Sequence, residues 1–189
     1  MSKTVVHCSV FTPDSALLTQ HSALFLLIGL PGSGKSTWVK QLLAECPQIH
    51  LISTDGIRGQ LFGNEAVQGH WLLIWREIRR QLHQAKNQGK TVIYDATNAQ
   101  RRQRRKVIAL ARGFGFTHIT GLWADTPVWL CLARNRKRDR QVPEEIIFKM
   151  HRQLRDAPPT LEDGLDRLIR LSGLREYGNC THPTSENPT

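Results

Sequence analysis

The sequence predicts an α/β fold of three layers, in which helices cover both faces of a central parallel sheet of about five strands. Short apolar runs alternate with longer amphipathic runs, which is typical of strand–helix–strand crossover units. The 189 residues contain no internal repeat and no linker rich in Pro, Gly or Ser, so we expect one domain. An apolar fraction of 40% and a charged fraction of 22% are ordinary for a globular chain.

The strands are predicted from five apolar runs, which span residues 24–28, 49–53, 91–95, 118–123 and 167–171. Helices are expected to begin near Lys35, Gly69, Ala99, Thr126 and Pro143. Asp125 and Thr126 precede Pro127, which indicates a capping side chain before a proline in the first turn. The second of these helices is expected to bury one face, formed by Trp71, Trp75, Ile78 and Leu82.

The alternating pattern holds over residues 23–171, which form the predicted domain. Residues 1–22 are expected to form an N-terminal arm, and residues 172–189 a disordered tail of low apolar content. The longest apolar run, residues 23–30, is too short to span a bilayer and does not resemble a signal peptide. The four separated cysteines form no zinc motif and are expected to be reduced thiols, so we predict a cytoplasmic protein.

Positive charge is concentrated in one part of the chain. The formal net charge is +10, and residues 101–140 hold eleven Lys or Arg against two Asp. A field of this kind attracts polyanions and phosphorylated ligands, which favours a phosphate-rich partner such as nucleic acid. Residues 101–106 are compatible either with a stripe that binds a nucleic-acid backbone or with a solvated helix face.

Residues 29–36 (GLPGSGKS) match the GxxxxGK[ST] pattern of a phosphate-binding loop, or P-loop, directly after the first strand. Its glycines let the chain turn tightly and point N–H groups at a polyphosphate, and the following helix N-terminus favours anions. Lys35 is expected to reach the β- and γ-phosphates, and the Ser36 hydroxyl to ligate Mg²⁺. The sequence therefore predicts a P-loop NTPase that binds ATP.

Acidic residues end the second and third strands, and therefore lie at the same sheet edge as the P-loop. Asp55 is a candidate general base for an attacking hydroxyl, a candidate helix N-cap, or both. Arg58 would lie on the same face and hold an anionic acceptor. Asp95 is expected either to bind Mg²⁺ through water or to brace residues 96–98.

Residues 134–140 (RNRKRDR) lie between two predicted helices. A charge run is often a solvated surface, but beside a P-loop we favour an arginine-rich lid over the transferring phosphoryl group. Trp71 and Trp75 are compatible with stacking on a base, although their helical spacing favours core packing.

From about residue 24 to 171 the sequence resembles the kinase domain of phage and bacterial polynucleotide 5′-kinases. The resemblance rests on the P-loop with the following Thr37 and Trp38, on STDGIR (53–58), on DATN (95–98) and on RNRKRDRQVP (134–143). It implies that Lys35, Asp55 and Arg138 are catalytic, that Asp55 and Arg58 bind the acceptor, and that Ser36 and Asp95 lie at the metal. The implied nucleotide ligands are Gly29, Gly32, Ser33, Gly34, Lys35, Ser36, Thr37, Arg134 and Arg138.

The resulting hypothesis is ATP-dependent transfer of the γ-phosphoryl group to the 5′-hydroxyl of RNA or DNA, with Mg²⁺. A first alternative is a P-loop kinase of a small molecule such as a sugar, nucleoside or amino sugar. A second is a nucleotide-gated nucleic-acid-binding protein without transferase activity.

Overall fold

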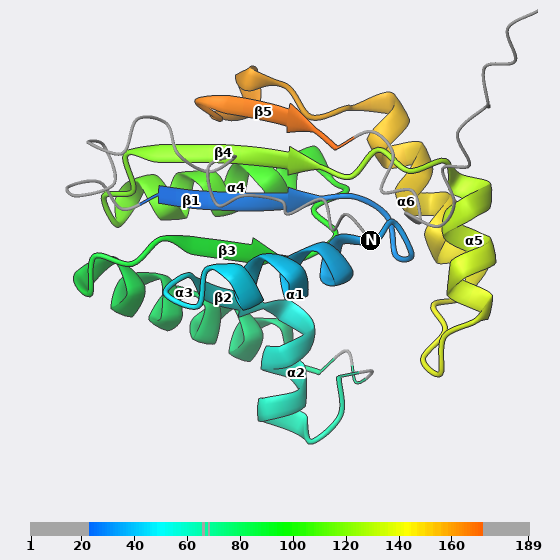
Figure 1. Cartoon of the computed structure of the whole chain (residues 1–189), viewed down its shortest axis with the longest axis horizontal. Helices are drawn as coiled ribbons and strands as arrows, with labels where there is room; N and C mark the ends of the chain where they lie inside the picture. Colours follow the sequence, from blue (N-terminus) through cyan, green and yellow to red (C-terminus); the bar gives the residue numbers. More distant parts are fainter. Residues whose placement is uncertain (1–22, 66, 68, 172–189) are drawn as a thin grey trace, which may run out of the picture.

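The computed structural model describes residues 23–65, 67 and 69–171, which form a central parallel sheet with helices on both faces (Figure 1). The strand order is β2-β3-β1-β4-β5, and every neighbouring pair is parallel. The strands are β1 (Ala23–Ile28), β2 (His50–Ser53), β3 (Val92–Asp95), β4 (His118–Trp123) and β5 (Arg167–Arg170). The predicted fold class is confirmed, and each strand boundary lies within one residue of the prediction.

The helices begin within two residues of the predicted positions. They are α1 (Lys35–Glu45), α2 (Thr54–Phe62), α3 (Trp71–Asn87), α4 (Arg101–Gly113), α5 (Val128–Arg136) and α6 (Glu144–Asp156), with a 3-10 turn η2 (Leu161–Asp163). Helix α2 was not predicted at its full length, since its two internal glycines weaken the helical signal. Its N-cap is Ser53 rather than the candidate Asp55, because the Ser53 Oγ accepts a hydrogen bond of 3.3 Å from the Gly56 N–H.

The sheet is buried on both faces, which explains why β1 is apolar throughout. Leu26 and Ile28 pack into a large core with side chains of α3, α4, α5 and α6. Leu27 points to the opposite face and packs with Val39 and Leu42 of α1. Alternating residues of one strand therefore hold the three layers together.

The carboxyl ends of the strands meet at one edge of the sheet, on the side to which the arrows point in Figure 1. The register pairs Ser53 with Asp95, and Ile28 with Trp123. The P-loop, the start of α2, the segment after β3 and the segment before α5 consequently lie at this same edge. This is where ligands bind in open parallel sheets.

Helix α3 buries a different face from the predicted one. Its buried residues are Ile74, Ile78, Leu82 and Ala85. Trp75 is half-buried against the core, whereas Trp71 is 42% exposed. The prediction was right for Ile78 and Leu82 and wrong for Trp71, because the buried stripe continues toward the N-terminus through Ile74.

Two smaller expectations also need correction. Neither Asp125 nor Thr126 caps α5: Pro127 is the N-cap, and the Thr126 hydroxyl donates to the Ser33 carbonyl at 3.0 Å instead. The thiol prediction is confirmed for Cys131, which is free and buried, and is wrong for Cys46, which is disulfide-bonded.

The remaining cysteines, the predicted arm and the predicted tail lie outside the described residues. Among the helices that the structure does describe, none has the length and apolar character needed to cross a bilayer.

Candidate active site

The P-loop adopts a conformation that requires glycine. Gly32 and Gly34 have φ angles of 82° and 94°, in the left-handed region, and Gly34 is the N-cap of α1. A Cβ on Gly32 would overlap the carbonyl oxygen of Cys131 in α5. Ser36 and Thr37 follow in the exposed first turn of α1, as expected for residues that meet a phosphate at a helix N-terminus.

The Lys35 side chain is buried inside the loop. Its Nζ donates to the carbonyl oxygens of Gly29 and Leu30, both at 2.8 Å, and to Ser33 Oγ at 3.3 Å. Burial lowers the pKa of Lys35 from 10.5 to about 8, and the nearby carboxylate of Asp95 is the largest influence in the opposite direction. The ammonium is thus held by dipoles that a phosphate oxygen can replace.

The segment after β3 is hydrogen-bonded to the start of the P-loop and to β1. Asn98, with a φ of 48°, donates through Nδ2 to the Leu27 carbonyl at 2.6 Å. The Gly29 N–H donates to the Thr97 carbonyl at 3.0 Å. These hydrogen bonds tie residues 97 and 98 to β1 and to the start of the P-loop, and neither of them involves the Asp95 carboxylate, which was one predicted brace for residues 96–98.

Asp95 and Ser36 face each other across the sheet edge. Burial raises the pKa of Asp95 above 3.8, while the charge on Lys35 and a hydrogen bond from the Ser36 side chain lower it. A hydroxyl and a carboxylate are hard oxygen donors of the kind that Mg²⁺ takes in nucleotide sites. The pair therefore fits the predicted metal position.

Asp55 lies in the first turn of α2 with half of its side chain exposed. Its Oδ1 is 2.5 Å from Arg58 Nη1, and its Oδ2 is 3.3 Å from Arg140 Nη1. The negative charge of Asp55 also raises the pKa of Asp95, so the two carboxylates lie within electrostatic reach. The N-cap alternative for Asp55 is wrong, because Ser53 occupies that position.

Arg58 was predicted to hold the acceptor, and the structure places it against Asp55. Its side chain is 15% exposed, and its buried Nε–H has no hydrogen-bond partner among the residues that the structure describes. Arg58 therefore pairs with Asp55 through Nη1 while its Nε–H stays buried.

The arginine-rich segment at the end of α5 divides into two groups. Burial raises the pKa of Cys131 and the charges of Arg134 and Arg138 oppose that rise, while the charge of Arg138 also adds to the lowering of the Lys35 pKa by burial. These two side chains therefore lie on the P-loop side. Arg136 turns away, because its Nε donates to Glu144 Oε1 at 2.7 Å.

Asn135 and Arg140 were missing from the predicted site. Asn135 is buried and holds the segment in place, donating to the Val142 carbonyl at 2.8 Å and accepting from the Val142 N–H at 3.0 Å. Arg140 lies between Asp55 and Glu65, at 3.3 and 3.6 Å. Arg140 belongs to the basic run 134–140 that the sequence shows. Its pairing with Asp55 becomes visible only in the structure.

Residues 101–106 are not one continuous basic stripe. Arg104 is fully buried, and its Nε donates to Asp163 at 2.8 Å while its Nη atoms donate to backbone carbonyls. Arg101 binds the other oxygen of the same carboxylate at 2.8 Å. Arg102, Arg105 and Lys106 are exposed. Neither alternative, a nucleic-acid stripe or a solvated helix face, holds for Arg104, and nothing in the sequence near α4 indicated its partner.

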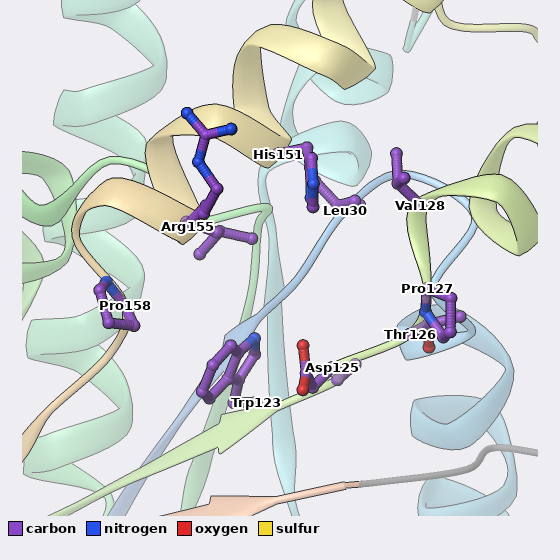
Figure 2. Close-up of a pocket in the computed structure, with 11 residues that line it drawn as sticks. Leu30, Trp123, Asp125, Thr126, Pro127, Val128, His151, Arg155 and Pro158 are labelled. Atoms are coloured by element: carbon purple, nitrogen blue, oxygen red, sulfur yellow. The ribbon is translucent and has the colours of Figure 1, made fainter.

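A cavity of about 270 Å³ lies next to the P-loop, between the end of β4 and α6. Figure 2 shows His151 and Arg155 projecting from α6 on one side, with Trp123, Asp125 and Thr126 on the other. Leu30 is its contact with the P-loop, and none of the predicted catalytic residues lines it. This cavity is therefore separate from the acid and the arginines of the site.

Comparison with known proteins gives similar chains that act on different substrates. L-seryl-tRNA(Sec) kinase from Methanococcus maripaludis is 26% identical over 146 residues, covering 72% of this chain and 54% of the relative. A chain in the Pnkp1/Rnl/Hen1 RNA repair complex is 22% identical with a TM-score of 0.66, covering 72% of this chain and 45% of its own. A gluconokinase from Sinorhizobium meliloti 1021 is 15% identical with a TM-score of 0.51, covering 82% and 85%.

The chain spans about half the length of the first two of these proteins, and the structural likenesses concern the fold alone. The AAA_33 family model, described as an AAA domain, matches residues 24–157. That match contains the P-loop, both carboxylates and the arginine segment. The kinase relatives support a phosphotransferase activity. Because the family model matches most of the chain, the chain belongs to the AAA_33 family of AAA domains.

Proposed function

We propose that the protein is an ATP-dependent kinase that transfers the γ-phosphoryl group to the 5′-hydroxyl of a polynucleotide. The observation that carries the proposal is the half-exposed carboxylate of Asp55, within electrostatic reach of Asp95 and flanked by Arg58 and Arg140. An accessible acid beside the phosphate loop is what an acceptor hydroxyl needs. The proposal includes a single kinase domain over residues 23–171 and a cytoplasmic location.

On the donor side, the P-loop N–H groups and Lys35 would hold the phosphates of ATP. The γ-phosphate would take the place of the carbonyl oxygens that Lys35 now contacts. Ser36 and Asp95 would hold Mg²⁺, which in such sites neutralises charge between the β- and γ-phosphates.

On the acceptor side, Asp55 would accept the proton of the 5′-hydroxyl, and the oxygen of that hydroxyl would attack the γ-phosphorus. The bond between that phosphorus and the β–γ bridging oxygen breaks, and ADP leaves with the electron pair. Arg134 and Arg138 would stabilise the charge that develops on the transferring group, from the P-loop side of α5. Arg58 would direct the guanidinium donors that Asp55 does not use to the acceptor phosphate.

Two observations favour a polynucleotide as the acceptor, and one favours a small molecule. The net charge of +10 attracts polyanions, and it is concentrated at residues 101–140. Two similar proteins, by their names, belong to an RNA repair complex and act on seryl-tRNA. The likeness to a gluconokinase over most of that chain favours the second candidate, a small-molecule kinase.

The acceptor is tested by incubating the protein with γ-labelled ATP and Mg²⁺ in the presence of several acceptors. These are 5′-hydroxyl RNA and DNA oligonucleotides, seryl-tRNA, gluconate and nucleosides. We expect label at the 5′ end of the oligonucleotides. Label only on gluconate or a nucleoside would establish the small-molecule alternative, and label only on the seryl group would reject 5′-end transfer.

The role of Asp55 is tested by Asp55→Asn, with Asp139→Asn as a control for the same charge change at an exposed lid position. Loss of the base should lower kcat by about 10²–10⁴ and leave ATP affinity unchanged. Full transfer by Asp55→Asn would remove the residue from the mechanism. Oligonucleotide affinity that depends on ATP, with no labelled product from the wild type, would instead identify a nucleotide-gated binding protein.

A further inference from the structure

Two tryptophans at the start of α3 form a stacked pair on the surface. The rings of Trp71 and Trp75 are 6.1 Å apart between centroids, with 27° between their planes. The Nζ of Lys106, on α4, lies 4.4 Å from the centroid of the Trp75 ring. Trp75 is anchored against the core, whereas Trp71 is 42% exposed, so the outer indole rests on a fixed base.

The pair lies at the same edge of the sheet as the acceptor site. Helix α3 packs against α2, which carries Asp55, and Figure 1 shows α3 running from beside α2 back along the sheet, opposite to the strand arrows. Helix α4 begins just after β3 and runs in the same direction as α3, since each precedes a parallel strand. Trp71 precedes Trp75 by one turn, and Arg102 precedes Lys106 by one turn on its own helix. Two aromatic and two cationic side chains thus lie in the first two turns of their helices, at the end of the sheet from which α2 also begins.

The charge of this surface is positive. Arg76 and Arg79 of α3 are exposed, as are Arg102, Arg105 and Lys106 of α4. The acid in this part of α3, Glu77, is already bound to Arg80 at 2.6 Å. Acids pair with Arg101, Arg104 and Arg112 of α4, whereas Arg102, Arg105 and Lys106 form no ion pair with the residues that the structure describes.

We propose that Trp71, supported by Trp75 and flanked by Arg102 and Lys106, is a stacking platform for a base of a single-stranded acceptor near its 5′ end. This inference rests on the proposed polynucleotide kinase function and names the form of its substrate. Every base has a π-face, so an indole holds single strands with little sequence preference, and nearby cations contact the phosphates. Base pairing would close a duplex base to such stacking, so the platform selects unpaired ends.

A hydrophobic contact with a second copy of the chain fits these residues less well. Leu72 and Leu73 are also exposed, but on a helix they point about 100° and 200° away from Trp71. The patch beside the indoles is cationic, which suits a polyanion and would repel an identical cationic patch.

The test is Trp71→Ala, with Trp71→Phe as a conservative variant and Leu72→Ala as an exposed neighbour control. With single-stranded 5′-hydroxyl oligonucleotides, Trp71→Ala should raise KM by about 5- to 150-fold and leave kcat and the KM for ATP unchanged. Trp71→Phe should restore most of the affinity, and Leu72→Ala should behave as the wild type. Replacing Lys106 with Gln should reduce the salt dependence of binding by about one phosphate contact.

Oligonucleotide binding is also measured without chemistry, by fluorescence anisotropy at fixed salt, so that the two proposals can fail separately. A wild type that transfers phosphate but loses no affinity in Trp71→Ala overturns the platform alone. A wild type that binds oligonucleotides through Trp71 but labels none of them overturns the kinase function and leaves the platform. A change in oligomeric state in Trp71→Ala, with unchanged oligonucleotide affinity, would identify a contact between copies and overturn the platform.

Discussion

Residues 101–106 and 134–140 have similar basic compositions, yet the structure uses them in different ways. In the first segment Arg104 is fully buried and Arg101 shares its partner, Asp163. In the second, Arg138 is exposed and its charge reaches Lys35 in the P-loop. The role of each charge run thus depends on residues that the fold brings to it from remote parts of the chain, Asp163 for the first segment and Lys35 for the second.

The largest expected effect concerns the second segment, residues 134–140, and the rate of phosphoryl transfer. Arg138→Ala should lower the single-turnover rate of transfer by about 10³ or more, because an arginine that stabilises the transferring phosphoryl group has an effect of this size. Urea unfolding should show unchanged stability, and oligonucleotide affinity should fall less than the rate. A greater loss of affinity than of rate would make the segment a docking surface.

The second prediction concerns stability. Arg104→Met should lower the free energy of unfolding by about 3–5 kcal/mol, because it removes the buried partner of the buried Asp163 carboxylate and leaves it only the partly exposed Arg101. The exposed neighbour provides the control, since Arg105→Met should change stability by less than about 0.5 kcal/mol. Urea denaturation measures both. Equal losses in the two variants would show that the segment has no buried member.

The smallest predicted effect is on pH dependence. The Lys35 pKa of about 8 lies below the ordinary value, so the amine loses its proton as pH rises through 8. Only the charged amine attracts phosphate, and ATP affinity should therefore fall by up to about tenfold per pH unit above 8. Titration calorimetry at pH 7, 8, 9 and 10 measures this decline. Constant affinity over that range would show that Lys35 stays protonated in the free loop.

The sequence predicts well what local patterns encode. The strands follow from short apolar runs, and the P-loop from eight consecutive residues that need their glycines for backbone reasons. The pairs Arg104–Asp163 and Arg140–Asp55 were not predictable, because each joins segments far apart in the chain. The exposure of Trp71 was misjudged for a related reason: helical spacing shows which residues share a face but not where the buried face ends.

One contact between the P-loop and α5 determines how the arginines can move. The backbone of Cys131 lies so close to Gly32 that a Cβ there would have no space. The Thr126 hydroxyl, just before α5, is hydrogen-bonded to the Ser33 carbonyl. The first turn of α5 is therefore held against the P-loop. Arg134 and Arg138 lie three and seven residues after Cys131, so a bend in the chain beyond Cys131 would change their distance to the nucleotide without moving the first turn.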